Sequence, residues 1–459
     1  MFCTSTGPRA RLYALLVVAL TCASTHASAQ SDPTDAPPET PAPVVATGEA
    51  PTWDELVDAA LRTNPTLDAL AARHDAALSR AEAAGSIWPQ PRLSVQAGVL
   101  PVETRQGPQY AVVGVQQAIP SLDRRREADD PHVAEARGLA LAWESEVLRT
   151  VHDVEVAWIQ LARLDAIADL VREQQAVIRD VATHESAVLA FGGAEHVDLL
   201  RTSLLDVVLE DRLEAIADAR DEVVATLAPR TALPEAALHA LRPALPSPLV
   251  PCASVDDLVA TAVARHPDPR RAEARGDGAL EAAELARLAV REPIQASIAW
   301  GTIGRYDTPM PGTGNGGRDT LMVGVSVPLP VARRASVADA QAHEATAAGA
   351  LDDAAALRLQ LASEIRGACT RIDAAQERIE RYERDLLPMA RDIVDHYAID
   401  LAVDGADHTE WLLAVEQVLS MREAVVEARA SAALADALLA ARRARGDVPT
   451  PPADAPGAP

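Results

Sequence analysis

The sequence predicts a mainly α-helical fold with a small β part, built as two copies of one unit. Residues 193–200 and 405–412 share a glycine, then acidic and polar residues, then an apolar run, and they lie about 210 residues apart. Long segments with helical periodicity flank both octapeptides, so each octapeptide indicates the turn of a helical hairpin. Two segments that alternate between apolar and polar residues precede each helical hairpin and predict a β-hairpin.

Two further matches support the duplication. Val-Gly-Val is followed by an apolar residue and a proline at 119–120 in the first copy and at 329–330 in the second. A short segment with apolar spacing ends in Asn-Pro at 64–65 and in His-Pro at 266–267. The matches occur in the same order at a nearly constant offset, which indicates an internal repeat. The predicted repeats are residues 52–248 and 249–445.

Composition and motifs exclude several functions. The chain of 459 residues has a net charge of −25, whereas a nucleic-acid-binding protein needs a basic face. The motifs HExxH, GxSxG and GxxxxGK[ST] are absent. A GxGxxG match at 312–317 follows a proline and precedes a predicted strand, which indicates a flexible loop instead of a dinucleotide site. We therefore expect no enzymatic activity, no catalytic residue, no cofactor, no metal ligand and no nucleic-acid partner.

Residues 1–29 have the features of a secretory signal peptide. Arginines precede an apolar run at 12–20, and Ala-Ser-Ala at 27–29 provides a cleavage site. The apolar run is too short for a membrane anchor, and the residues before Cys22 match a lipoprotein signal poorly. Segments rich in proline and without periodicity predict a flexible linker over residues 30–51 and a disordered tail over residues 446–459.

Four cysteines occur, of which Cys3 and Cys22 lie in the leader. Cys252 and Cys369 show neither CxxC spacing nor neighbouring metal ligands. We expect two unpaired thiols, and one disulfide is the alternative.

Each copy begins with short helices. The first is predicted to start near Thr52. Asn64 then supplies an N-cap, and Pro65 the first helical residue, of an alanine-rich helix that runs to about residue 86. His266 and Pro267 open the matching helix of the second copy.

The predicted strands cover residues 93–99 and 110–119 in one β-hairpin, and 294–300 and 320–329 in the other. Strands that cross a bilayer need about 9–11 residues, and these are nearly that long. Isolated hairpins leave unpaired edges, so a transmembrane β-barrel is favoured over an edge hairpin on a soluble domain. Four aromatic residues at or near the strand ends would form an interfacial girdle. They are Trp88, Tyr110, Trp300 and Tyr306.

One chain offers four strands, whereas membrane barrels have about eight or more. A homotrimer is therefore predicted, in which three chains supply twelve strands.

The longest helical patterns cover residues 122–191 and 332–403, and each would extend roughly 105 Å at 1.5 Å per residue. Apolar residues between Leu361 and Ile393 have coiled-coil spacing, which predicts core positions for Tyr382 and Met389. Return helices complete helical hairpins at about 122–228 and 332–445.

Prolines are expected to interrupt or end these helices. We expect a helix start or a kink at Pro131 and at Pro388. A series of prolines from Pro229 to Pro251 is predicted to mark the connection between the copies.

His196 and His408 lie beside carboxylates at equivalent positions of the two turns. A solvated polar turn is favoured there over a metal site, since the other histidines suggest no ligand cluster.

The sequence resembles the TolC family of outer-membrane efflux proteins in the order of its features. These are the signal peptide, the duplicated helices that begin at Asn-Pro or His-Pro, the strand pairs and the long helical hairpins. The resemblance covers about residues 52–445 and rests on the duplicated order of features. It implies a trimer with a twelve-stranded barrel in the outer membrane and an α-barrel tunnel that extends into the periplasm. It also implies a periplasmic adaptor and an inner-membrane pump as partners.

The family's helical tip often carries an arginine four residues before a Val-Gly or Leu-Gly pair. The corresponding positions here hold Ala187 and Ile399, so the adaptor contacts are expected to differ in detail. The predicted tip and docking residues are Phe191, Gly192, Gly193, Val403, Asp404 and Gly405.

The acidic residue that narrows the family's channel corresponds to Glu410, whereas a second acidic position corresponds to Leu413. Our hypothesis is that carboxylates of the two turns ring the periplasmic mouth and attract cations. These residues are Glu195, Asp198, Asp407 and Glu410. The alternative is that they are ordinary acidic residues at helix N-termini, where the helix dipole favours them.

The predicted function is a passive exit duct for small molecules or metal ions. The alternative is a periplasmic coiled-coil adaptor or scaffold, which would normally have one helical hairpin between compact β domains. The resemblance implies a drug, a metal ion or a protein as the exported substrate.

Overall fold

The computed structural model describes residues 50–85, 89–104, 107–190, 196–246, 252, 254–289, 293–304, 319–329, 333–402 and 408–443. All of these belong to one compact unit, Gly48–Pro459. The predicted signal peptide, nearly all of the predicted linker and the predicted C-terminal tail lie outside the described residues.

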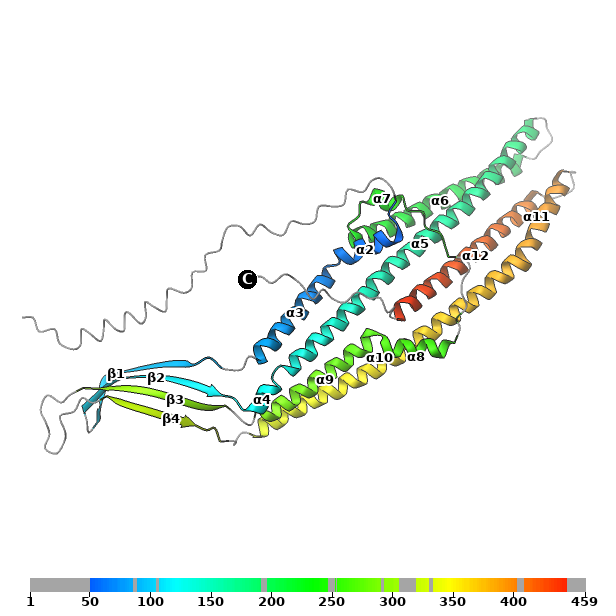
Figure 1. Ribbon diagram of the computed structural model, residues 1–459. Helices are drawn as coiled ribbons and strands as arrows, with labels where there is room; N and C mark the ends of the chain where they lie inside the picture. Colours follow the sequence, from blue (N-terminus) through cyan, green and yellow to red (C-terminus); the bar gives the residue numbers. More distant parts are fainter. Residues whose placement is uncertain are drawn as a thin grey trace, which may run out of the picture. The chain divides into compact units, whose positions relative to one another are not determined.

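Both halves of the chain share an order of two shorter helices, two strands and a long helical hairpin (Figure 1). The first half contains α2 (Trp53–Thr63), α3 (Pro65–Gly85), β1 (Arg92–Thr104), β2 (Gly107–Ile119), α4 (Leu122–Arg126), α5 (Asp130–Ala190), α6 (His196–Thr231) and α7 (Glu235–His239). The second half contains α8 (Val255–Arg265), α9 (Pro267–Leu288), β3 (Ile294–Ile303), β4 (Thr320–Ser326), α10 (Arg333–Arg381), a π-helix (Tyr382–Leu386), α11 (Leu387–Ala402) and α12 (His408–Arg442). The predicted fold class, mainly α-helical with long helical hairpins and a small sheet, is confirmed.

Side chains define the starts of the short helices. Thr52 is the N-cap of α2 and forms a capping box there. At the start of α3, the Thr66 N–H donates to Asn64 Oδ1 at 2.9 Å. At the start of α9, the Asp268 N–H donates to His266 Nδ1 at 3.2 Å. Equivalent helices of the two halves are therefore capped by different side chains.

The strands form one antiparallel sheet in the order β1-β2-β3-β4 (Figure 1). β2 and β3 join the two halves, with Ile119 opposite Ile294. β1 extends past the predicted end because a register shift between Ala97 and Val102 lets pairing resume beyond the point where the alternation stops. β1 and β4 are the edge strands of this sheet among the described residues.

One face of the sheet is apolar and exposed. Residues directly opposite each other in antiparallel strands share a face, so the register assigns two adjacent apolar rows to one face. The rows are Leu93, Val115, Ile298 and Val323, and Val95, Val113, Trp300 and Leu321. All eight side chains are exposed, up to 73% for Leu321 and Val323. A row of the other face is small or polar, with Arg92, Gln116, Ser297 and Gly324.

The helices pack as neighbours in two series that share α5. One series is α3, α5, α9 and α10, and the other is α6, α5, α12 and α11. α5 contributes to cores in both series. Its Trp143 and Val147 pack with Leu67 of α3. Farther along, Val171 and Ile178 pack with residues of α6 and α12. Among the described helices, none combines the length and the apolar character needed to cross a membrane.

The prolines act partly as predicted. α5 starts at Asp130, next to Pro131, and the π-helix directly precedes the turn that contains Pro388. Pro229, however, lies inside α6, which continues to Thr231 before the connection between the halves begins.

The π-helix changes which residues of the long second helix are buried. The predicted apolar stripe is buried from Leu361 to Ala375, but Met389 is 55% exposed and Ile393 is also exposed. Leu387 and Ala390 are buried in their place. A π-helical turn inserts about one extra residue, which rotates all later side chains around the helix axis. The expectation of a core position for Met389 is therefore wrong.

Candidate functional site

Most residues predicted for the ends of the helical hairpins lie outside the described part of the chain. These are Phe191, Gly192, Gly193, Glu195, Val403, Asp404, Gly405 and Asp407. The same holds for the aromatic residues Trp88 and Tyr306. Tyr110 lies within β2, and Trp300 is an exposed residue within β3. The described members of the predicted carboxylate ring are Asp198 and Glu410.

The structure brings the first turns of α6 and α12 together. Asp198 Oδ1 lies 3.5 Å from Arg201 Nη1 on the same helix. The same Arg201 nitrogen donates to Thr409 Oγ1 of α12 at 2.6 Å. Glu410, the next residue of α12, is exposed. Asp198 therefore lies beside a cation that compensates its charge, whereas no described cation pairs with Glu410.

His408 forms a buried polar cluster at this end of the hairpins. Its side chain is 7% exposed, and Nε2 lies 2.9 Å from Glu185 Oε1 and 3.0 Å from Thr202 Oγ1. The Thr202 hydroxyl donates to the other carboxylate oxygen of Glu185 at 2.9 Å. The His408 ring also lies against Trp411, with 6.0 Å between the ring centroids. The expectation that His408 belongs to a solvated turn is therefore wrong.

This cluster joins the two helical hairpins. Glu185 and Thr202 come from α5 and α6 of the first half, and His408 comes from α12 of the second. A buried carboxylate is stable only with hydrogen-bond donors or a cation around it, so His408 and Thr202 satisfy Glu185. The cluster adjoins a shared core that includes Val171, Ile178, Leu209, Trp411 and Val415.

Ion pairs continue the connection between the halves. Arg212 of α6 lies 2.7 Å from Glu423 of α12. Two further pairs join α5 to α12: Arg422 with Glu173 at 2.8 Å, and Arg163 with Glu427 at 2.6 Å. These partly exposed pairs contribute less stability than the buried cluster, because water screens them.

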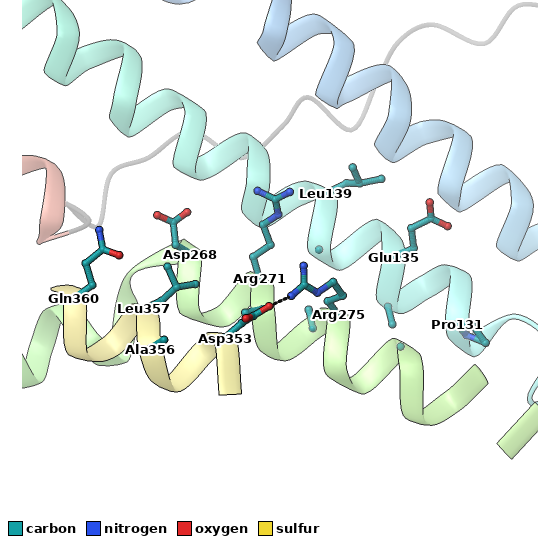
Figure 2. Close-up of a pocket in the computed structure, with 15 residues that line it drawn as sticks. Pro131, Glu135, Leu139, Asp268, Arg271, Arg275, Asp353, Ala356, Leu357 and Gln360 are labelled. Carbon is teal, nitrogen blue, oxygen red and sulfur yellow. Dashed lines mark hydrogen bonds and ion pairs between the residues drawn. The ribbon is translucent and has the colours of Figure 1, made fainter. Parts of the chain in front are cut away.

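A pocket of about 750 Å³ lies between α5, α9 and α10 (Figure 2). Small residues, including Gly138, Ala272 and Gly278, form much of its wall. Its polar side chains include Asp268, Gln360 and an ion pair between Arg275 and Asp353. The pocket and Glu185 lie at different ends of α5, about 70 Å apart at 1.5 Å per residue. No residue of the predicted site lines this pocket.

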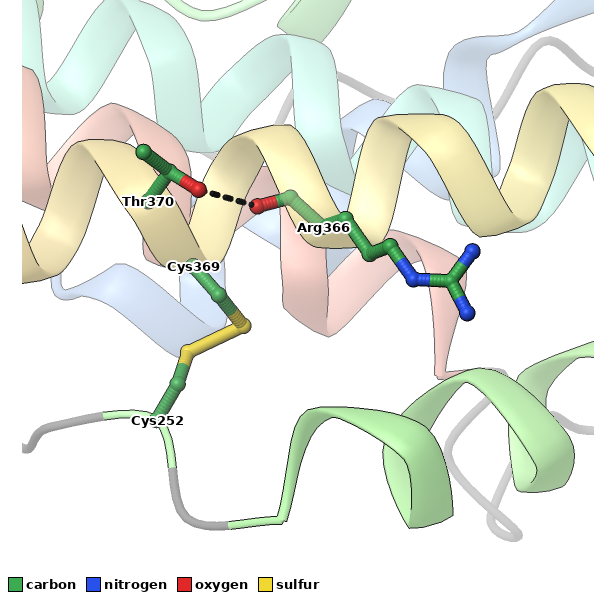
Figure 3. Close-up of a disulfide and its surroundings, with 4 residues drawn as sticks. All are labelled: Cys252, Arg366, Cys369 and Thr370. Atoms are coloured by element: carbon green, nitrogen blue, oxygen red, sulfur yellow. Dashed lines mark hydrogen bonds between the residues drawn. A yellow bond between two sulfur atoms is a disulfide. The ribbon is translucent and has the colours of Figure 1, made fainter.

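Cys252 and Cys369 form a disulfide, with 5.6 Å between their Cα atoms (Figure 3). The expectation of two unpaired thiols is wrong. Cys252 lies in the connection before α8 and Cys369 is buried on α10, where both join a cluster with Ala262 and Ile365. The packing of the connection against α10 decides the pairing, and cysteine spacing alone does not reveal it.

Among the described residues, no group of three or more histidine, cysteine, aspartate or glutamate side chains is arranged to hold a metal ion.

No protein-family model and no curated protein matches this chain. Solved structures of outer-membrane proteins do match it. VceC from Vibrio cholerae aligns with a TM-score of 0.68 at 19% identity, over 85% of this chain and 96% of its own. The outer-membrane channel OprN aligns with a TM-score of 0.70 at 17% identity, over 86% of this chain and 91% of its own.

The chain has the fold of these outer-membrane channels. The open-state channel MtrE from Neisseria gonorrhoeae also aligns, with a TM-score of 0.62 at 14% identity, over 86% of this chain and 89% of its own. The fold predicted from the duplicated pattern thus extends over nearly the whole length of each matched channel chain.

Sequence reasoning missed Glu185 and Thr202. His408 was noticeable because His196 occupies the equivalent place in the first copy. The partners of His408 come from the other half of the chain, and no local pattern marks them.

Proposed function

We propose that the protein is the exit duct of a tripartite efflux system in the outer membrane, and that it carries small molecules or metal ions passively from the periplasm to the exterior. The observation that carries the proposal is the exposed apolar face of the sheet. Eight large apolar side chains on one face, with mostly small and polar residues on the other, are typical of a strand set that contacts lipid outside and water inside.

The assembly in this proposal is a homotrimer. β1 and β4 are edge strands, and strand edges within a membrane have to be paired, so each β4 would pair with β1 of a neighbouring copy. Three copies close a barrel of twelve strands, with Tyr110 and Trp300 as members of its aromatic girdle.

The helices support the same assembly. α6 and α11 end one packing series, and both carry exposed apolar residues at helical spacing. On α6 these are Val197, Leu200, Leu204, Val207 and Val208, and on α11 they are Met389, Ile393 and Ile399. In the proposed trimer, α11 of one copy packs against α6 of the next, so the π-helix turns Met389 toward a neighbouring copy.

The partners in this proposal are a periplasmic adaptor and an inner-membrane pump, which would meet the channel at the hairpin tips. Glu410 and Asp198, with Glu195 and Asp407, form the proposed carboxylate ring at the periplasmic mouth. Threefold symmetry repeats each carboxylate three times, which attracts cations. The cluster of Glu185, Thr202 and His408 holds the two hairpins of one copy together behind this ring.

Purification of the full chain from outer membranes tests the proposal. Extraction should require detergent, native mass measurement should give a trimer, and planar bilayers should show stepwise ion conductance. A monomer that stays soluble without detergent and forms no channels contradicts the proposal.

A further inference from the structure

The junction between α8 and α9 depends on one buried histidine. His266 follows the last residue of α8 and is 3% exposed. Its Nδ1 accepts the hydrogen bond from the Asp268 N–H at 3.2 Å, so the ring nitrogen that faces the helix start carries no hydrogen. The ring hydrogen of the neutral form is then on Nε2, which is buried without a hydrogen-bond partner among the described residues.

Charged groups from three helices surround this ring. On α9 itself, Asp268 Oδ2 lies 3.7 Å from His266 Nδ1. Arg442 of α12 and Glu364 of α10 both act on His266 and pair with each other, with 2.6 Å between Nε and Oε2. From α5, the Ser145 hydroxyl donates to Asp268 Oδ1 at 2.6 Å.

Two further ionisable groups of α5 belong to this neighbourhood. The charge of Asp268 raises the pKa of Arg149, and the charge of Arg442 lowers the pKa of His152. His152 also has a buried ring nitrogen, Nδ1, without a partner among the described residues. Two histidines, His152 and His266, thus interact with the charge of Arg442, which pairs with Glu364.

A proton on His266 conflicts with this arrangement in two ways. It occupies Nδ1, the atom that accepts the N-cap hydrogen bond, so the Asp268 N–H loses its partner. It also creates a positive charge at the N-terminus of α9, where the helix dipole is itself positive. Burial lowers the pKa of His266; Asp268 opposes this effect and Arg442 adds to it.

The duplicated half supplies a natural comparison. Asn64 occupies the equivalent position at the start of α3, and its Oδ1 accepts from the Thr66 N–H at 2.9 Å. Its Nδ2 donates to Glu146 Oε1 at 3.0 Å and to Thr150 Oγ1 at 2.8 Å. An amide makes the same cap without titrating, so only one of the two halves has a proton-sensitive cap.

The pocket between α5, α9 and α10 gives solvent a route to this junction. Asp268 and Gln360 both line it (Figure 2). Asp268 is the carboxylate beside His266, and Gln360 donates to Glu364 at 2.8 Å. The buried ring is therefore one residue away from a solvent-filled space, which allows proton exchange without unfolding.

We propose that His266 is a proton-sensitive cap, and that acidification opens the α8–α9 junction of the second half while the equivalent junction of the first half stays closed. The opening frees the first turn of α9, which leads into β3, and weakens the packing at the end of α12 where Arg442 lies. This inference stands apart from the transport function.

Hydrogen–deuterium exchange of the full-length protein in detergent tests the proposal, in the wild type and in His266→Asn. The peptide of interest covers residues 266–272, and each comparison is made at one pH so that the chemical exchange rate cancels. At about pH 5 the wild type should exchange severalfold faster than His266→Asn, because one unit of pKa difference corresponds to about tenfold. At about pH 7.5 the two proteins should exchange alike, because neutral histidine and asparagine both cap.

Four controls sharpen the test. Residues 64–70 of the same molecule should show no difference between the proteins at either pH. His266→Ala removes the acceptor and should exchange fast at both pH values, and His266→Ser is a second cap that does not titrate, for use if the asparagine variant folds poorly. His343→Gln removes a half-exposed histidine of α10 and should behave as the wild type. Equal exchange of wild type and both non-titrating variants at about pH 5 overturns the proposal.

Discussion

His408 Nε2 of the second helical hairpin lies 2.9 Å from Glu185 Oε1 of the first, and both side chains are almost fully buried. One hairpin belongs to the first half of the sequence and the other to the second. This contact therefore joins the two halves at one end of the helices. Thr202 completes the cluster and leaves neither carboxylate oxygen of Glu185 without a donor.

Replacing only one member of this pair should destabilise the protein strongly. His408→Phe leaves Glu185 buried without its main partner, and we expect the free energy of unfolding to fall by about 3–5 kcal/mol. The double variant Glu185→Leu, His408→Phe removes both polar side chains and should recover most of that loss. Unfolding in denaturant, followed by circular dichroism, provides the measurement.

Arg172→Ala is the matched control, on α5, the helix that also carries Glu185. Arg172 pairs with Asp169 in an exposed position, so its loss should change the free energy of unfolding by about 0–1 kcal/mol. A His408→Phe effect no larger than that of Arg172→Ala contradicts the structural role of the cluster.

The disulfide should also contribute to stability. It closes a loop across 117 residues of sequence separation, and cross-links over loops of this size stabilise by about 2–5 kcal/mol. Reduction should therefore lower the melting temperature of the wild type. The double variant Cys252→Ser, Cys369→Ser should melt like the reduced wild type and should not respond to reductant; a wild type indifferent to reductant argues against this contribution.

The fold was predictable because its signals are local. The capping side chains Asn64 and His266 and the alternation before Ile119 each act within a few residues, and the repeat supplied these signals twice. The side-chain cluster around His408 and the pairing of Cys252 with Cys369 depend on residues from distant segments. Local patterns do not encode such contacts, so the sequence indicated the polar residues without their partners.

The π-helix illustrates a second limit. The coiled-coil spacing continues through Met389 and Ile393 in the sequence, yet one inserted residue rotates these side chains out of the core of their own chain. Pro388 predicted a disturbance of the helix, but a proline alone does not predict whether the phase of the helix changes.

The two faces of the sheet should respond oppositely to charge. Val115 and Gln116 are neighbours on β2 that point to opposite faces, toward the apolar rows and the polar row respectively. Val115→Arg places a cation on the proposed lipid face, which is unfavourable by about 2–4 kcal/mol near the bilayer centre. We expect less Val115→Arg protein in urea-washed outer membranes, whereas Gln116→Arg should insert normally. Equal insertion of both variants argues against a lipid-facing sheet.

Acid should destabilise the protein through His266, which is buried, and His152, which is partly buried. Burial lowers the pKa of His152; the charge of Asp153 opposes this effect, and the charge of Arg442 adds to it. Burial also lowers the pKa of His266. The unfolded chain then binds more protons than the folded one, so stability is complete above about pH 6.5 and is lost as the pH falls toward the folded-state values. The double variant His152→Gln, His266→Asn should lose less melting temperature between about pH 7.5 and pH 5 than the wild type. If the double variant loses as much melting temperature as the wild type over this pH range, other groups cause the acid sensitivity.

The carboxylates at the hairpin ends should influence ion selectivity, and Glu410 more than Asp198. Glu410 is exposed and has no described cation beside it, whereas Arg201 lies 3.5 Å from Asp198 and compensates its charge. The double variant Asp407→Ala, Glu410→Ala should therefore show a smaller cation preference and weaker block by divalent ions than the wild type. The reversal potential of single channels in a salt gradient measures the preference. Asp198→Asn should have a smaller effect, and Glu222→Gln, farther along α6, should have none. If the double variant keeps the wild-type reversal potential and divalent block, these carboxylates only stabilise helix N-termini and the constriction lies elsewhere.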